Sequence, residues 1–495
     1  MAEQKEKVIP ITPAAEVEQS LLAVKQKIYP RAVHGWFANW RIALVVFTQL
    51  LYYGLPWLTW DNRQAVLFDL AARKFYILGL VLWPQDFIYL TGLLVISAFS
   101  LFLFTAVAGR LWCGYACPQT VYTEMFMWIA RKIEGDRPKQ IKLDKMPWNA
   151  EKITKKTAKH AAWLALALWT GFTFVGYFVP IKELAVSFAH WTLGSWEIFW
   201  IFFYGFATYG NAGFMREQVC IYMCPYGRFQ SGMFDADTLT VTYDVSRGEP
   251  RGSRAKSVDR HAAKLGDCVD CGICVQVCPT DIDIRDGLQY ECIGCAACID
   301  ACDQVMDKMG YPRGLIRYTT ENVIDGKYKD EDILAHALRP RTLIYGVVLL
   351  AIVSTFGITL LNRVPLRVDA IRDRIAIRET AEGWVENVYR IQIINMDGKT
   401  HRYAISVSGL PGVKVTDKVT EIEIPPLQNQ DMVVHLQFDP NQGKSESESE
   451  SESEHKSEHK SESEYKSESR PVLFTVQAED DKKLQKSVKS TFLIR

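Results

Sequence analysis

Twelve cysteines in four tight groups are the residues of this chain with the greatest capacity for chemistry. Two groups hold four cysteines each, in CVDCGICVQVCP (268–279) and CIGCAACIDAC (292–302), and two hold pairs, in CGYACP (113–118) and CIYMCP (220–225). No cysteine lies outside these groups. Disulfides that stabilise a fold usually join positions far apart in the sequence. Gaps of two and three residues are instead typical of metal ligands.

The two four-cysteine runs predict two [4Fe–4S] clusters. Each run has the C-x2-C-x2-C-x3-C spacing of two-cluster bacterial ferredoxins, in which the last cysteine of one run binds the cluster of the other run. We therefore expect one cluster on Cys268, Cys271, Cys274 and Cys302, and a second on Cys292, Cys295, Cys298 and Cys278. Zinc also binds sets of thiolates, but its sites usually comprise two separated C-x2-C pairs.

Three residues beside these cysteines bear on the clusters. Gly272 and Gly294 are expected to relieve crowding where the backbone passes close to a cluster. Asp303 follows the last cysteine, where bacterial ferredoxins often have proline. Its negative charge should lower the reduction potential of the nearby cluster.

The remaining cysteines form two C-x3-C-P elements. On a helix, residues four apart share one side, so Cys113 with Cys117 and Cys220 with Cys224 could each present two sulfurs to one metal, and the proline would then end or kink the helix. The two elements could meet at a membrane boundary as a four-thiolate site. The interpretations left open are a third iron–sulfur or other metal site, a copper site assisted by Met215 and Met223, and a reversible thiol pair. For the two methionines, simple packing is the more frequent role.

Five apolar runs are long enough, at about 20 residues, to cross a bilayer. They cover 42–60, 87–108, 161–180, 195–214 and 342–361. Tryptophans near their ends are typical of the membrane interface. The fourth run is the weakest, because Glu197 lies in its first turn. We expect an α-helical transmembrane bundle, and the polar stretch 1–19 predicts no cleaved signal peptide.

The Lys and Arg counts of the connections predict the orientation of these spans. Residues 1–41 carry six and residues 109–160 carry eleven, whereas 61–86 carry three and 181–194 carry one. Basic connections stay in the cytoplasm. The N-terminal segment 1–41 and the ferredoxin region 215–341 should therefore be cytoplasmic, and stable disulfides there are improbable. Four arginines at 363–374 oppose this rule, since they follow the last span on the outer side.

The region 362–495 predicts an all-β, immunoglobulin-like sandwich. Six segments alternate apolar and polar residues between Gly and Pro turns: 388–396, 401–410, 420–427, 432–438, 471–479 and 489–495. The Ser/Glu tract 445–469 has almost no apolar residue and should be a disordered loop. His455 and His459 in it could contact a metal, but a solvated loop is the simpler interpretation. With 57 basic and 57 acidic residues, net charge gives no argument for a nucleic-acid partner.

The paired C-x3-C-P elements, the eight-cysteine module and the terminal sandwich together resemble the cytochrome cbb3-type oxidase accessory proteins called CcoG, FixG or RdxA. The resemblance covers almost the whole chain, and the Ser/Glu tract departs from it. It implies a protein of the bacterial inner membrane with two [4Fe–4S] clusters, in which the charge rule would place everything after residue 361, the terminal domain, in the periplasm. It also implies an oxidoreductase that reduces Cu(II) to Cu(I) for the copper–haem centre of the oxidase, with Cys113, Cys117, Cys220 and Cys224 handling copper or the last electron step. Implied partners are oxidase assembly factors or copper carriers.

Two other functions stay open at this point. A quinol-linked polyferredoxin subunit would share the C-x3-C-P helices, but it needs a proton acceptor within the membrane, and Glu197, His190 and His160 all look interfacial. A non-catalytic assembly scaffold would use its clusters for structure only. The sequence contains no Gly-rich dinucleotide or flavin motif. It therefore leaves the electron donor open, and the oligomeric state with it, a homo-oligomer included.

Overall fold

The computed structural model describes residues 27–258, 260, 262–380, 383–417, 421–439 and 468–494. The chain forms two compact units that separate after Ser354. The first unit is helical and contains the cysteine-rich module, and the second contains the C-terminal strands. The boundary therefore falls inside the last long helix, α16 (Pro340–Leu361), seven residues before the predicted domain boundary at 361.

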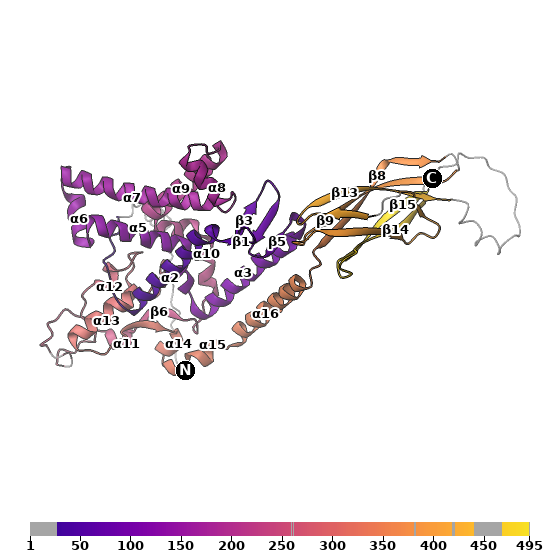
Figure 1. Ribbon diagram of the computed structural model, residues 1–495. Helices are drawn as coiled ribbons and strands as arrows, with labels where there is room; N and C mark the ends of the chain where they lie inside the picture. The colour runs from indigo at the N-terminus through magenta and orange to yellow at the C-terminus, as the bar shows by residue number, and fades with distance from the viewer. Residues whose placement is uncertain are drawn as a thin grey trace, which may run out of the picture. The chain divides into compact units, whose positions relative to one another are not determined.

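Helices of very different lengths build the first unit (Figure 1). In chain order they are α2 (Trp36–Gly54), α3 (Phe87–Ala108), α4 (Leu111–Tyr115), α5 (Pro118–Glu134), α6 (Arg137–Lys145), α7 (Ala150–Val175), α8 (Ile181–Ala189), α9 (Ser195–Gly210) and α10 (Pro225–Phe229). Between α2 and α3 lies a small antiparallel sheet of β3 (Val66–Asp69), β4 (Lys74–Ile77) and β5 (Leu80–Leu82). A two-stranded ribbon, β1 (Thr59–Trp60) with β2 (Arg63–Gln64), precedes it.

The predicted spans agree with the structure only in part. Among the described residues, two helices are long and apolar enough to cross a membrane, Pro84–Ala108 and Pro340–Leu361, and they correspond to the runs 87–108 and 342–361. The other three runs differ in their limits. Helix α7 begins eleven residues before its run, where Asn149 accepts a hydrogen bond from the Lys152 amide. Helix α9 has 16 residues and continues as a π-helical turn.

The first predicted span, 42–60, is wrong at both ends. Helix α2 begins at Trp36 and ends at Gly54, so residues 59–60 belong to a strand. Pro56 explains the early end, because it has no amide hydrogen to donate to the carbonyl of Tyr52. The Tyr177 hydroxyl donates to that carbonyl instead, at 2.7 Å.

Helices α7 and α9 approach each other very closely. A Cβ added at Gly171 would lie 2.2 Å from the Ile201 carbonyl oxygen, and one added at Gly205 would lie 3.0 Å from the Leu168 side chain. Small residues at such a contact let two backbones pack directly, as helices do in membranes. Helix α5 contacts α7 on another side, where the Trp163 indole donates to the Phe126 carbonyl at 2.9 Å.

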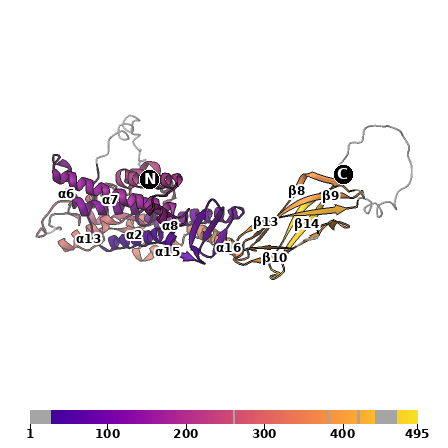
Figure 2. The ribbon, with the colours of Figure 1, turned by 45° about the horizontal axis from the view of Figure 1, so that its top comes forward.

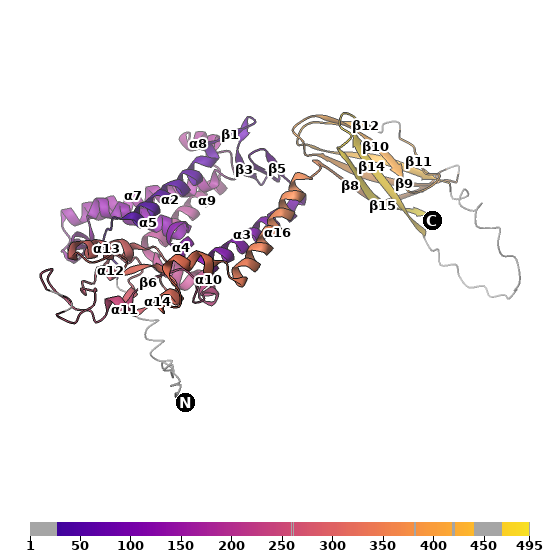
Figure 3. The ribbon, with the colours of Figure 1, turned by 90° about the horizontal axis from the view of Figure 1, so that it is seen from below.

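The eight-cysteine module packs against helix α2 (Figure 3). It contains α12 (Ile273–Gln276), α13 (Ala297–Met309) and an antiparallel pair, β6 (Thr240–Tyr243) with β7 (Ile316–Thr319). Asp300 on α13 accepts hydrogen bonds from the Phe37 and Ala38 amides, at 3.2 and 2.7 Å. These amides are unpaired donors at the N-terminus of α2, so a residue of the module caps a helix that lies 260 positions earlier in the chain.

The second unit is the predicted sandwich (Figure 2). Two antiparallel four-stranded sheets, in the orders β12-β10-β14-β15 and β11-β13-β9-β8, enclose an apolar core that includes Tyr389, Tyr403 and Phe474. The strands are β8 (Leu366–Glu379), β9 (Val385–Asn395), β10 (His401–Ser408), β11 (Lys414–Val415), β12 (Glu421–Ile424), β13 (Asn429–Phe438), β14 (Glu468–Ala478) and β15 (Gln485–Ile494). All six predicted strands are present.

Two predictions about this unit, on the arginines after the last span and on the Ser/Glu tract, differ from the structure or lie partly outside the described residues. Strand β8 was not predicted, and it contains three of the four arginines that opposed the charge rule. Those arginines belong to a folded sheet, and the charge rule applies best to short loops. Residues 445–467 of the Ser/Glu tract, which include His455 and His459, lie outside the described residues. The last two residues of the tract, at 468 and 469, begin β14.

Candidate functional site

Two cavities in the module are lined by cysteines of both runs. The first is lined by Cys268, Cys271, Cys274 and Cys302. The second is lined by Cys278, Cys292, Cys295 and Cys298, with Cys274 between the two. The last cysteine of each run thus lies with the first three of the other run, which is the arrangement that the spacing predicts.

The shape of these cavities fits clusters better than single ions. Among the described residues, no three His, Cys, Asp or Glu side chains converge as ligands of one metal ion. Zinc requires its thiolates on a common point, about 2.3 Å from each sulfur. A four-iron cluster instead holds its four sulfur ligands apart around a cage. Four cysteines drawn from both runs around each cavity therefore fit the [4Fe–4S] interpretation.

The sulfurs need a cation to become anionic ligands. Burial, together with the neighbouring thiolates, raises the pKa of Cys292 and of Cys302 to about 12. The pKa of Cys298 is raised well above its ordinary value for the same reasons. Iron would supply the missing positive charge, because metal binding and thiol deprotonation are coupled.

The two glycines of the cysteine loops have different roles. Both adopt left-handed backbone conformations, with φ of +63° at Gly272 and +64° at Gly294. A Cβ at Gly272 would meet no protein atom within 4 Å, so conformation and not crowding by the chain explains this glycine. A Cβ at Gly294 would lie 3.2 Å from the Arg110 backbone, so here close approach adds to conformation.

In both C-x3-C-P elements the last cysteine is extended and precedes a new helix, which is not the predicted structure. Cys113 lies in α4, but Cys117 is extended and precedes α5. Cys220 lies in a π-helical turn (Val219–Met223), and Cys224 is again extended and precedes α10. The prediction that each pair shares one helix face is therefore wrong. The proline is the reason, because it disfavours the helical conformation in the residue before it and is well accommodated at the first position of a new helix.

The four cysteines of these elements nevertheless lie near one another. Burial, together with the thiolates of Cys117 and Cys224, raises the pKa of Cys113 to about 11 and that of Cys220 to about 12. Gln230, just after the second element, lies 3.4 Å from the Cys113 sulfur through its Nε2 atom. The structure thus brings together two pairs that are about 100 residues apart.

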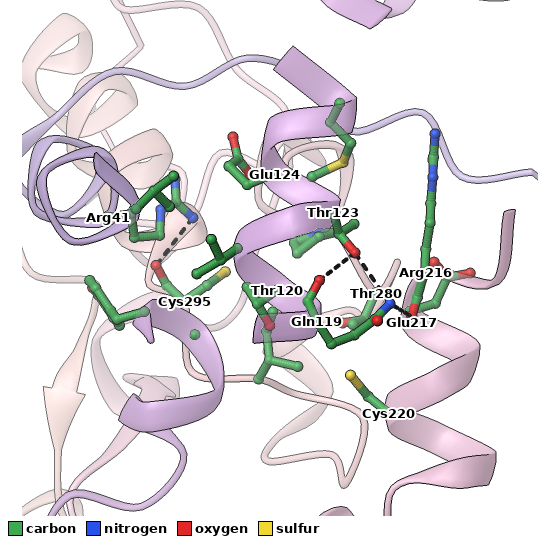
Figure 4. A pocket seen from close by; sticks show the side chains of 17 residues that line it. Arg41, Gln119, Thr120, Thr123, Glu124, Arg216, Glu217, Cys220, Thr280 and Cys295 are labelled. Atoms are coloured by element: carbon green, nitrogen blue, oxygen red, sulfur yellow. Dashed lines mark hydrogen bonds between the residues drawn. The ribbon is translucent and has the colours of Figure 1, made fainter. Parts of the chain in front are cut away.

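The first C-x3-C-P element packs directly against the loop of the second cavity. A Cβ added at Gly114 would lie 2.8 Å from the Cys295 Cα atom and 2.9 Å from the Gly294 carbonyl oxygen. Cys295 and Cys220 line one pocket between the module and the helices (Figure 4). The four-cysteine group and the second cavity are therefore neighbours, without an intervening layer of side chains at Gly114.

Several residues that hold this contact were not predicted from the sequence. Arg110 donates to the carbonyls of Cys292, at 3.0 Å, and Tyr290, and Tyr318 donates to the Gly294 carbonyl at 2.5 Å. Arg41 donates to the Cys295 carbonyl at 3.3 Å. The sequence did contain a signal for Arg41 and Arg110, because each lies at the end of an apolar run. Charged residues in or beside membrane spans usually have a functional role.

Comparison with known proteins agrees with this architecture. Residues 215–321 match a 4Fe–4S dicluster domain, residues 90–135 match a 4Fe–4S binding domain, and residues 356–495 match the Ig-like fold at the C-terminus of FixG. Protein RdxA of Cereibacter sphaeroides is 38% identical over 86% of this chain and 92% of its own length. The chain belongs to the FixG/RdxA family.

Two further relatives extend the comparison. The nitrogen fixation protein FixG of Rhizobium meliloti is 40% identical over 80% of this chain and 82% of its own length. Protein RdxB of C. sphaeroides is 40% identical over 79% of this chain and 83% of its own length. A solved FixG-related protein from Vibrio parahaemolyticus, 22% identical, covers 26% of the chain with a TM-score of 0.20, which supports no argument. The matches confirm an iron–sulfur protein of the electron-transfer type with a terminal Ig-like fold.

The glycine of the first element offers a direct test of this packing. Replacing Gly114 with valine should separate the element from the cysteine loop, because its Cβ would overlap backbone atoms that cannot move aside cheaply. We expect intact iron content and slowed electron transfer from the clusters to any acceptor at the four cysteines, measured by rapid-mixing optical spectroscopy. Gly232→Val is the matched control, since a Cβ there meets nothing within 4 Å. An unchanged rate in Gly114→Val would contradict the expectation that electrons pass from the clusters to the four cysteines through this contact.

Proposed function

We propose that this chain is a membrane-bound iron–sulfur oxidoreductase that reduces Cu(II) to Cu(I) at Cys113, Cys117, Cys220 and Cys224. The observation that supports it best is the packing of Gly114 on the backbone of Cys295, a residue that lines the second cysteine cavity. Electron transfer to a metal bound by these cysteines would then cross only a short distance.

The chemistry of the four sulfurs favours copper in its reduced state. Soft thiolate ligands prefer Cu(I) over Cu(II), so binding lowers the free-energy cost of reduction. Each Cu(II) takes one electron and no proton, so the site needs no proton carrier for the reduction itself. Copper is the substrate in this proposal, and its release would leave the cysteines ready for another ion.

Two [4Fe–4S] clusters, when bound, would supply the electrons. Cys268, Cys271, Cys274 and Cys302 would hold one, and Cys278, Cys292, Cys295 and Cys298 the other. The chain's own contribution is to bury the sulfurs and to fix the loop of the second cluster through Arg110 and Tyr318. The test is Cu(II) reduction by the chemically reduced protein, with and without the four remaining cysteines.

A third iron–sulfur cluster at the four cysteines is the alternative that a specific observation favours. The match to a 4Fe–4S binding domain covers residues 90–135 and so includes Cys113 and Cys117. Such a cluster would make the chain a relay to another protein. Iron and sulfide analysis separates the two proposals, because the relay requires iron in excess of two clusters and the copper site does not.

A quinol-linked relay also has a structural feature in its favour. A cavity between α2, α5, α7 and α9 is lined by Tyr52, Tyr122 and Tyr204, and by Pro118, which follows Cys117. Gln49 also lines this cavity, and its side-chain Oε1 atom is buried and accepts no hydrogen bond among the described residues. Reduction of the clusters by a soluble quinol analogue would favour this relay over a soluble donor.

The membrane arrangement completes the proposal. Two helices are long and apolar enough to cross a membrane, and two more expose large apolar side chains. On α9 these are Trp196, Phe199, Phe202, Phe203 and Phe206, and on α2 they are Ile42, Val46, Phe47 and Leu50. Such surfaces are costly in water and favourable in lipid. We therefore propose five spans in the bacterial inner membrane, with the clusters cytoplasmic and the Ig-like unit periplasmic, where it would contact cbb3-type oxidase assembly factors or copper carriers.

Reporter fusions test this topology. A reporter that is active only outside the cytoplasm should work when fused after residue 380 and fail when fused at 250 or 320, because the basic connections keep the module inside. Enzyme activity per unit of fusion protein is the measurement. An active fusion at 320 would place the clusters in the wrong compartment and contradict the five-span arrangement.

A further inference from the structure

Two arginines from the helical part of the first unit contact the loop of the second cavity. Arg41 on α2 donates from Nη1 to the Cys295 carbonyl (Figure 4). Arg110, which is buried, donates to the carbonyls of Cys292 and Tyr290 and, at 3.1 Å, to that of Gly227. These acceptors are backbone groups without net charge, so both guanidinium charges remain beside the cysteines.

No carboxylate neutralises either arginine at close range. Within the part of the chain that the structure describes, neither forms a salt bridge within 4.0 Å. Of the nearby acids, Glu124 pairs with Arg131 at 2.8 Å. Asp300 accepts hydrogen bonds from the neutral amides at the start of α2, so its negative charge remains and offsets part of the charge of Arg41.

The surroundings of the first cavity are less positive. Arg254 donates to the Cys268 carbonyl at 3.2 Å, as Arg41 does to that of Cys295. Arg285 also lies beside this cavity but pairs with Asp283 at 2.6 Å and with Asp270 at 2.5 Å, so its charge is more than compensated. Asp303, which follows Cys302 directly in the chain, adds a third carboxylate. Cys271 of this cavity is exposed to solvent.

We propose that Arg41 and Arg110 give the cluster at Cys278, Cys292, Cys295 and Cys298 the higher reduction potential of the two. Electrons would then enter at the other cluster, beside exposed Cys271, and leave from this one across the Gly114 contact toward the four remaining cysteines. A reduced cluster carries one more negative charge, and a nearby positive charge stabilises it. Deeper burial of the second cavity acts in the opposite direction. The charges of two arginines against the one carboxylate of Asp300, in a medium of low dielectric constant, outweigh it. The inference rests on the cluster ligands of the proposed function, but not on copper as the acceptor.

The test is a redox titration of the full-length protein, purified without oxygen and followed by electron paramagnetic resonance. In the wild type, the signal that Cys278→Ser removes should be reduced first as the potential is lowered. In Arg41→Gln, the ratio of reduced to oxidised form of this same cluster should fall at least tenfold at a fixed potential. For a one-electron couple, that corresponds to a decrease of about 59 mV in its reduction potential. Arg41→Lys should restore most of this shift, because it keeps the charge.

Arg285→Gln is the matched control, since it should move only the signal of the other cluster. The proposal is overturned if the two wild-type signals are reduced in the reverse order, which needs no arginine variant to measure. It is equally overturned if Arg41→Gln moves neither signal or moves both by the same amount. A wild-type protein that shows the expected order but does not reduce Cu(II) would defeat the proposed function alone.

Discussion

Serine at Cys113, Cys117, Cys220 and Cys224 is expected to abolish Cu(II) reduction while both ferredoxin clusters remain. The reason for the loss is chemical, because a serine hydroxyl gives neither the soft ligand nor the negative charge that stabilises Cu(I). The reason for the selectivity is structural, because none of these four residues lines either cluster cavity of the module. We expect the rate with chemically reduced protein to fall at least ~100-fold, which corresponds to about 2.7 kcal/mol of activation free energy.

Two sets of controls make this result interpretable. The double variants Cys113→Ser/Cys117→Ser and Cys220→Ser/Cys224→Ser should each lose as much activity as the quadruple variant, because residues that act as one site are not additive. Tyr222→Phe, at an exposed position on the second element, should keep the wild-type rate. In cells, the quadruple variant should depress cbb3-type oxidase activity, and added copper should restore it only partly.

The opposite outcome would be equally informative. A quadruple variant that reduces Cu(II) at the wild-type rate with both clusters present would exclude the four cysteines as the reducing site. Loss of iron beyond two clusters in the same variant would instead support a third iron–sulfur cluster there. Neither result could be mistaken for misfolding, because the two module clusters serve as an internal measure of folding.

The contrast between the two cysteine motifs shows how much of this site is encoded locally. The eight-cysteine runs could be predicted because their spacing fixes the ligands within a few residues, and the structure groups them accordingly. The C-x3-C-P elements were predicted wrongly because helix periodicity was applied through Cys117 and Cys224. The proline that follows each makes the cysteine extended, and that local effect overrides the helical spacing.

Contacts between distant segments could not be predicted from one sequence. Arg110 and Cys292 are 182 residues apart, and the cap that Asp300 provides to α2 spans more than 260 residues. No periodicity or motif marks such pairs. The sandwich strands were predictable because alternation is a local signal, whereas β8 was missed because its alternating arginines were interpreted as charges flanking the membrane.

Replacing Cys278 with serine is expected to destroy the cluster of the run to which Cys278 does not belong in sequence. Cys278 lines the second cavity with Cys292, Cys295 and Cys298, so its loss leaves that cluster with three thiolates. Iron content should fall by about half, because one of two equal clusters is lost. The reciprocal variant, Cys302→Ser, should remove the other cluster, and the two variants should lose different resonance signals.

The pair of variants separates exchanged ligands from a simple arrangement in which each run binds its own cluster. In the simple arrangement, Cys278→Ser would damage the cluster held by Cys268, Cys271 and Cys274, and Cys302→Ser the one held by Cys292, Cys295 and Cys298. Thr280→Val is the control for local disturbance, since the Thr280 hydroxyl lies 3.2 Å from the Cys278 sulfur but is not a ligand. It should retain both clusters, so that loss of a cluster in Cys278→Ser reports the missing thiolate itself.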